Sequence, residues 1–339
     1  MAPESSMTGR WLRRLWSIKE EIGHMRRSAT TASADTRCDG DSAQDGSIHS
    51  TDSGQLSFQS SADDEDARTQ AAEDTIAKKT VWLVRHGQAV HNIEENDAKR
   101  RAAEEAAAAG CDPSSEAFKE YVEAARKTAL SNVHLHDAPL SEAGRAQVQA
   151  ARDTINELVT ERGLSAPTRV LTSPLQRTLQ TTAIIFPEHP KVHMRECLRE
   201  RRTGLPCDER QSAEMIRNRR SFAFMSSLEL VALDSQSQEL AGDDHVETKP
   251  KLRNRTLRVI GELLKFQDDS ICIVTHKGCL RELERGPFGR PGATEFGNCE
   301  VRAYDISVRA DGELTASLIY AGDDPAGVAE GPGCPDAKN

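Results

Sequence analysis

The fold prediction begins from the stretch Val81-Trp82-Leu83-Val84-Arg85-His86-Gly87. Its first four residues are apolar, which is typical of a short buried strand, and the strand ends at Arg85 and His86. Open α/β sheets bind ligands at the carboxyl ends of their strands, so we expect both side chains in a ligand site. Gly87 permits a close backbone approach, and Asn92 adds a neutral donor on the same loop. The stretch therefore predicts a phosphoryl-binding loop; a histidine with a purely structural role is the alternative for the tripeptide alone.

Composition divides the 339-residue chain into four segments. Residues 1–27 place apolar side chains largely on one helical face between basic residues, which predicts a basic amphipathic helix. Residues 28–77 are rich in Ser, Thr, Asp, Gln and Ala and predict a disordered linker. Residues 323–339, with their Gly and Pro, predict a disordered tail. The remaining residues, 78–322, suit a single sizeable α/β domain.

Charge and cysteine content limit the classes of partner. A net charge of −10 argues against nonspecific nucleic-acid binding. The eight cysteines show no paired metal-site spacing, which predicts free thiols in a reducing, cytoplasmic compartment. No window approaches 18 uncharged apolar residues, so we expect no transmembrane segment. For residues 1–27, peripheral membrane contact, partner binding, organelle targeting and a merely solvated helix stay open as alternatives, although three glutamates count against targeting.

Hydrophobic periodicity predicts strands at residues 80–85, 169–172, 192–194, 270–275, 300–307 and 313–320. It predicts helices over 94–128 with an interruption at 110–113, from 141 to about 162, from 173 onward, and over 252–266. Ser141 and Ser173 are the expected N-caps, with Pro174 as the first residue of its helix and Gly163 as a helix stop. The alternation of strands and helices predicts a three-layer α/β/α sandwich with a mostly parallel central sheet.

Polar residues follow three of the predicted strands. Besides Arg85 and His86, they are Ser173, which leads to Arg177, and His276. Arg177 falls in the first turn of a helix, whose N-terminal amides and dipole also favour an anion. Arginine is the preferred bidentate partner of phosphate oxygens. If the three strands are neighbours, two arginines and two histidines converge on one phosphate site.

Several ordered motifs resemble those of the histidine phosphatase superfamily, in its phosphoglycerate-mutase-like branch. The motifs are Leu83–Gly87 with Asn92, Ser173–Thr181, Leu198-Arg199-Glu200 with Gly204, Val274–Gly278, and Asp137–Gly144. Two further blocks are similar to plant and fungal phosphoglycerate-mutase-like proteins: Arg195–Glu200 with Cys207-Asp208 and Arg210, and Phe296–Glu300. The resemblance covers nearly the whole predicted domain and implies that family's three-layer fold.

The resemblance implies a phosphatase acting on a small phosphorylated substrate without a cofactor. His86 is implied as the nucleophile that forms a phosphohistidine, and Glu200 as the general acid and base. Glu196 is the rival acid, although its spacing to Gly204 fits less well. The implied phosphate-binding residues are Arg85, Asn92, Arg177 and His276.

The chain departs from the family pattern at some positions. Gln88 stands where many relatives carry Glu, and Lys277 where Gly or Ser is common. We expect Arg201, Arg210 and Lys277 to bind a further anionic part of the substrate, with a solvated basic face as the alternative. The helical insertion at 94–128 is expected to shape the mouth of the pocket.

Three alternatives stay open from the sequence. His134, His136 and Asp137 with His91 imitate a metal site, but no fixed spacing supports one, so we expect none. A phosphomutase of the phosphoglycerate mutase type shares the same core residues with a phosphatase. A noncatalytic interaction protein would use residues 1–27 and the acidic linker as its working parts.

Overall fold

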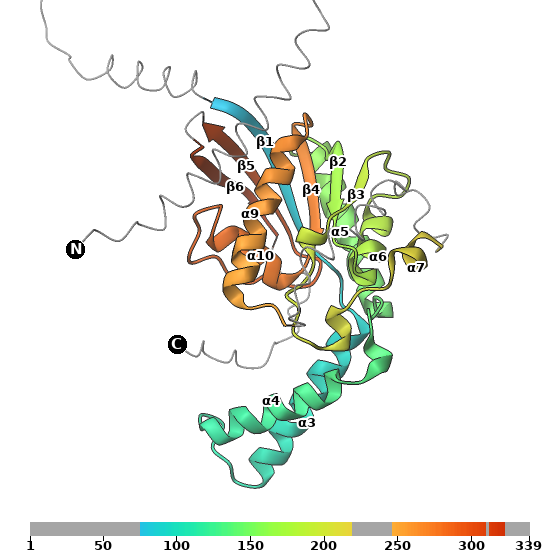
Figure 1. Ribbon diagram of the computed structural model, residues 1–339, viewed down its shortest axis with the longest axis vertical. Coiled ribbons are helices and arrows are strands. Elements are labelled where there is room, and N and C mark those ends of the chain that lie inside the picture. The colour runs from blue at the N-terminus through green and yellow to red at the C-terminus, as the bar shows by residue number, and fades with distance from the viewer. Residues whose placement is uncertain (1–74, 219–245, 310–311, 323–339) are drawn as a thin grey trace, which may run out of the picture. The chain divides into compact units, whose positions relative to one another are not determined.

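The computed structural model describes residues 75–218, 246–309 and 312–322, and its centre is a six-stranded sheet (Figure 1). The strand order is β3-β2-β4-β1-β5-β6. The strands are β1 (Thr75–Arg85), β2 (Arg169–Thr172), β3 (Val192–Met194), β4 (Ser270–Thr275), β5 (Val301–Arg309) and β6 (Leu314–Ala321). The predictions for residues 1–27, nearly all of 28–77, and 323–339 lie outside the described residues.

The carboxyl ends of the central strands meet at one edge of the sheet. β1, β2, β3 and β4 pair in parallel. Arg85 lies opposite Thr275, and Thr172 lies opposite Val274, so three strands end at the same level. The residues that follow them are those predicted to bind phosphate. The mostly parallel sheet is confirmed.

β5 runs against β1. The Arg85 N–H donates to the Glu300 carbonyl, while the Thr80 hydroxyl donates to Asp305. The two strands are therefore antiparallel. β6 forms the edge of the sheet beyond β5. These two strands complete the sheet, and β5 brings its amino end to the site edge, where Glu300 pairs with Arg85.

The described residues fall into two compact units. Residues 75–77 with Ser307–Leu314 belong to the first, and Lys78–Ile306 with the residues from Thr315 belong to the second. All predicted site residues belong to the second unit.

Helices cover both faces of the sheet and make the predicted three-layer sandwich (Figure 1). α5 (Glu142–Thr160) and α6 (Gln176–Ile185) lie on one face, and α9 (Lys249–Lys265) and α10 (Lys277–Arg285) lie on the other. Trp82 and Val84 of β1 pack with Val148 of α5 and Leu179 of α6, and all four side chains are fully buried. Leu83, between them in the chain, faces the opposite layer because strand side chains alternate. Burial of each large apolar side chain contributes roughly 1.5–3 kcal/mol.

The predicted helical insertion is a pair of helices, α3 (Val90–Ala108) and α4 (Glu116–Leu130), that pack against each other. The chain reverses between them at Gly110, whose φ of 77° is in the left-handed region. The remaining described elements are η1 (Val133–Leu135), η2 (Glu196–Leu198), η3 (Pro206–Asp208) and α7 (Ala213–Arg217). In the described ranges, no helix is long and apolar enough to span a bilayer.

The start of α6 differs from the prediction. The sequence indicated Ser173 as N-cap and Pro174 as the first helical residue, but α6 begins at Gln176 with Leu175 in the N-cap position. The acceptor for the helix start comes from elsewhere in the chain, because Asp137 Oδ1 accepts the Gln176 N–H at 2.7 Å. The Ser173 hydroxyl instead contacts a histidine of the site.

A tight contact between two glycines joins the β1–α3 loop to the start of α5. Ser141 is the α5 N-cap as predicted: its hydroxyl accepts the Gly144 N–H at 2.9 Å, and its own N–H donates to the Gln88 carbonyl. A Cβ on Gly144 would lie 1.9 Å from the Gln88 oxygen, and one on Gly87 would lie 2.7 Å from the Gly144 oxygen. Neither position accommodates a side chain without moving backbone.

We predict that Gly144→Ala destabilises the protein. Gly-to-Ala in a helix ordinarily stabilises it by about 1 kcal/mol, whereas a clash with backbone in a packed interior costs about 1–3 kcal/mol. Urea unfolding followed by circular dichroism should show the loss. Gly292→Ala is the matched control, since no atom lies within 4 Å of a Cβ there. Equal stability of the two variants would contradict the proposed contact.

Candidate active site

His86 lies directly after β1 and is held in one tautomer. Its side chain is buried, and Nδ1 lies 2.7 Å from the Gly87 carbonyl oxygen. A carbonyl only accepts, so the proton is on Nδ1 and the lone pair is on Nε2. The segment 296–298 holds this strand end in place: Arg85 Nη1 donates to the Phe296 carbonyl at 2.6 Å, and Asn298 Nδ2 donates to the His86 carbonyl.

His276 lies at the corresponding position after β4 and is the N-cap residue of α10. It is fully buried, and its ring centroid lies 5.0 Å from that of His86 at 61°. Its Nε2 lies 2.8 Å from the Ser173 hydroxyl, which follows β2. The three strand ends therefore do converge.

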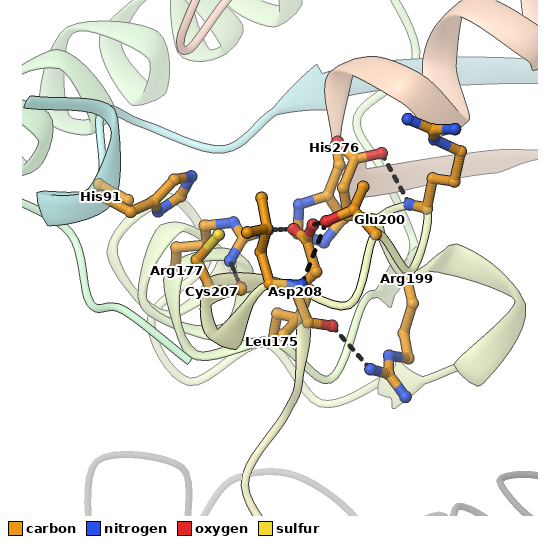
Figure 2. A network of polar contacts seen from close by, with 12 residues as sticks. His91, Leu175, Arg177, Arg199, Glu200, Cys207, Asp208 and His276 are labelled. Atoms are coloured by element: carbon orange, nitrogen blue, oxygen red, sulfur yellow. Dashed lines mark hydrogen bonds and ion pairs between the residues drawn. The ribbon is translucent and has the colours of Figure 1, made fainter. Parts of the chain in front are cut away.

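Arg177 reaches the same place from the first turn of α6. The side chain is 1% exposed. Nη1 donates to the Cys207 carbonyl at 2.7 Å, and Nη2 lies 3.6 Å from Asp208 Oδ1. The guanidinium is thus oriented by the 206–208 turn, η3 (Figure 2).

Three buried nitrogens near these residues have no hydrogen-bond partner among the described residues: Arg177 Nε, His276 Nδ1 and His91 Nδ1. Buried polar atoms in native proteins are nearly always paired, so each such atom requires an explanation. An anion in the site supplies acceptors for groups of this kind.

The electrostatic field of the site also favours an anion. Burial lowers the pKa of His86 well below its usual range, and the charges of Arg177 and Arg85 lower it further. Burial and Arg177 lower the pKa of His276 in the same way. Both imidazoles are therefore neutral at neutral pH, beside two permanently charged guanidinium groups.

Glu200 is held beside this group by two backbone N–H donors. Oε1 accepts from Arg201 at 2.8 Å, and Oε2 accepts from Gly278 at 3.3 Å. A Cβ on residue 278 would lie 2.3 Å from Oε1, so the glycine makes room for the carboxylate. Figure 2 shows Glu200 close to Asp208 and His276. The glycine in the Val274–Gly278 motif therefore accommodates the Glu200 side chain.

The rival acid, Glu196, is occupied by structural contacts. It is 1% exposed and forms ion pairs with Arg210 and Arg199. Removing either charge would leave the other buried without compensation. These contacts favour Glu200 over Glu196 as the acid.

Asp208 is a carboxylate of this site to which the sequence assigned no role. It is buried, accepts a hydrogen bond from Thr203 at 2.5 Å, and faces Arg177. Burial raises its pKa to about 6, although Arg177 opposes the rise. The Cys207-Asp208 pair was part of a recognised motif, but only the contact with Arg177 shows what it does.

Asn92 and His91 come from the first turn of α3. Asn92 Oδ1 accepts the Ala89 N–H at 3.0 Å, and Nδ2 lies 3.1 Å from His91 Nε2. The His91 ring lies 6.4 Å from that of His86. The metal alternative would need His91 together with His134 and His136, but His134 and His136 are exposed while His91 is buried in the site. No group of three or more His, Cys, Asp or Glu side chains in the described ranges is arranged to hold a metal.

The predicted substrate-binding residues differ in their exposure and in their contacts. Arg210 is ion-paired with Glu196 and largely buried. Lys277 is partly exposed and lies 3.1 Å from Glu295. Arg201 is partly exposed, and its backbone N–H holds Glu200. Arg201 and Lys277 remain predictions for substrate contact, whereas the ion pair of Arg210 speaks for a structural role.

Comparison with known proteins gives the following matches. Residues 126–309 match the family model of the histidine phosphatase superfamily (branch 1). The chain is 24% identical over 293 residues to phosphoglycerate mutase-like protein 1 of Arabidopsis thaliana, covering 74% of this chain and 89% of that protein.

Among solved structures, a putative alpha-ribazole-5'-P phosphatase from Escherichia coli matches at 18% identity, with a TM-score of 0.42 and coverage of 74% of this chain and 99% of the other. A mycobacterial glucosyl-3-phosphoglycerate phosphatase in complex with VO3 matches at 16% identity, with a TM-score of 0.42 and coverage of 71% and 98%.

The family match includes Arg177, Glu200 and His276 and begins after Arg85 and His86. The similarity to the phosphoglycerate mutase-like relative supports the same branch. Because the matched residues make up more than half of the chain, this protein belongs to the histidine phosphatase superfamily (branch 1).

Proposed function

We propose that this protein is a phosphatase that hydrolyses a small phosphomonoester through a phosphohistidine on His86. The observation that carries the proposal is the hydrogen bond from His86 Nδ1 to the Gly87 carbonyl, which leaves the Nε2 lone pair available. The lowered pKa of His86 keeps this imidazole neutral at neutral pH. A neutral imidazole is the form that attacks phosphorus.

The reaction has two steps. His86 Nε2 attacks the phosphorus, and the bond to the ester oxygen breaks while Glu200 donates a proton to that oxygen. Water then attacks the phosphohistidine, Glu200 takes a proton from the water, and phosphate leaves with His86 restored. Arg85, Arg177 and His276 bind the transferring group and stabilise its spread charge, and we assign Asn92 to the same task.

A phosphomutase would form the same phosphohistidine and differ only in the acceptor. Its second step transfers the phosphoryl group to a hydroxyl of a second substrate rather than to water. Release of inorganic phosphate without an added acceptor favours the phosphatase.

We predict that a ³²P-labelled phosphomonoester labels His86. The label should be labile in acid and stable in alkali, as expected for a phosphoramidate bond. His86→Ala should show neither labelling nor hydrolysis, whereas the exposed His134→Ala should behave as the unaltered protein. Hydrolysis should persist in EDTA, because each proposed step uses only protein side chains. Label on a serine, or labelling of His86→Ala, would disprove the mechanism.

A second prediction separates the two carboxylates of the site. For an alkyl phosphate, Glu200→Gln should slow phosphohistidine formation by roughly 10²–10⁴, the usual contribution of general acid catalysis. For an aryl phosphate with a good leaving group the loss should be small, because that oxygen leaves without a proton. Asp208→Asn should slow both substrates alike, since Asp208 acts by orienting Arg177. Rapid-quench labelling measures these rates.

The assignment of the acid depends on which variant shows the leaving-group effect. If Asp208→Asn rather than Glu200→Gln slows phosphohistidine formation only with the alkyl substrate, Asp208 is the proton donor. Its raised pKa of about 6 suits that task.

The buried imidazoles predict acid instability. The folded-state pKa values of His86, His91 and His276 lie well below their ordinary value of 6.5, so the unfolded chain binds more protons below pH 6.5. The contribution of these three imidazoles to the free energy of unfolding is therefore fully present above pH 6.5. It falls as the pH drops, by up to about 1.4 kcal/mol per pH unit for each imidazole. Urea unfolding between pH 7.5 and 5 measures this slope. His86→Gln should reduce the slope of unfolding free energy against pH by the contribution of one imidazole. The exposed His134→Gln should leave the slope unchanged. An unchanged slope in His86→Gln would contradict the lowered pKa of His86.

A further inference from the structure

His91 is a buried imidazole of the site that the proposed mechanism does not use. We infer that His91 donates a hydrogen bond from Nδ1–H to an oxygen of the phosphoryl group bound at His86. This inference rests on the proposed function, because it names an additional binding residue for the same phosphoryl group.

The hydrogen bonds around Asn92 determine the tautomer of His91. The Ala89 N–H donates to Asn92 Oδ1 at 3.0 Å, and only an oxygen accepts there, so the amide orientation is fixed. The amide nitrogen, Nδ2, then faces His91 Nε2 at 3.1 Å. Because an amide nitrogen only donates, Nε2 is the acceptor and the ring proton is on Nδ1.

The Nδ1–H group is a buried donor without an acceptor in the part of the chain that the structure describes. His91 is 7% exposed, and Nδ1 has no hydrogen-bond partner among the described residues. Glu95, the nearby carboxylate, is instead held by Lys99 at 2.8 Å and Arg126 at 2.7 Å. A buried N–H without an acceptor is unfavourable by about 1–3 kcal/mol, so an acceptor is expected in the site.

The position of the ring shows which acceptor fits. Its centroid is 6.4 Å from that of His86, a separation that a phosphoryl group on one ring and a hydrogen bond from the other can span. In Figure 2 the His91 ring is directed toward Arg177 and Cys207. A phosphoryl group on His86 Nε2 carries three oxygens. The two buried guanidinium groups leave at least one of them available to accept a further hydrogen bond. A neutral donor here adds a hydrogen bond to the anion without adding repulsion between cations.

Binding of inorganic phosphate, measured by calorimetry, tests the inference without turnover. We expect His91→Phe to weaken phosphate binding at least about tenfold, the loss typical of one hydrogen bond to a charged group. His91→Asn should restore most of the affinity, because its amide nitrogen occupies the position of Nδ1. His134→Phe is the matched control on an exposed histidine and should bind as the unaltered protein does.

A second measurement covers the case in which His91→Phe fails to fold. In ¹⁵N-labelled unaltered protein, His91 should be the Nδ1–H tautomer, and its Nδ1 proton should shift downfield when phosphate is added. An Nε2–H tautomer, an unshifted proton, or unweakened binding in folded His91→Phe overturns the inference.

The two proposals fail separately. If His86 is not labelled but phosphate affinity still depends on His91, the phosphohistidine mechanism is wrong and His91 remains a phosphate-binding residue. If His86 is labelled but His91→Phe binds phosphate normally, the mechanism stands and the role of His91 is wrong. Absence of phosphate binding to the unaltered protein overturns the role of His91.

Discussion

The chemistry that we propose for the site depends on one hydrogen bond, from His86 Nδ1 to the carbonyl oxygen of the next residue. It determines which ring nitrogen keeps its lone pair, and the backbone conformation that allows it is maintained by packing. The contact between Gly87 and Gly144 leaves no space for a side chain at either position, so the loop is pressed against the start of α5. The tautomer of His86 is therefore a consequence of how the first strand is joined to a helix on one face of the sheet.

The charges around that histidine are arranged for an anion. Two guanidinium groups are buried beside imidazoles that burial keeps neutral, and buried donors lack acceptors within the described part of the chain. In the proposed function, a phosphoryl group supplies acceptors for these donors. The interactions would then be strongest with the charged group in transfer, which is the state that an enzyme should bind most tightly.

Much of this site was predictable because its residues follow strands. Buried strands are recognisable from runs of apolar residues, and in a parallel sheet the residues after them meet at one edge, as Arg85, His86 and His276 do. The start of α6 was predicted wrongly because its helix start is capped by Asp137, a residue far away in the sequence. Asp208 was overlooked for the same reason, since an acid in a turn looks solvated until its contact with Arg177 is seen.

The sequence by itself determined the order of the six strands, most of the long helices and the polar residues at the strand ends, because periodicity and caps such as Ser141 depend on near neighbours in the chain. The tertiary structure alone decided the protonation and the pairing of those residues. The His91 tautomer requires the helix start at Ala89, and the availability of Glu200 rather than Glu196 requires Gly278 on one side and Arg210 on the other. Burial and charge act through space, so residues distant in sequence set the pKa values of the imidazoles and the contacts of the two glutamates.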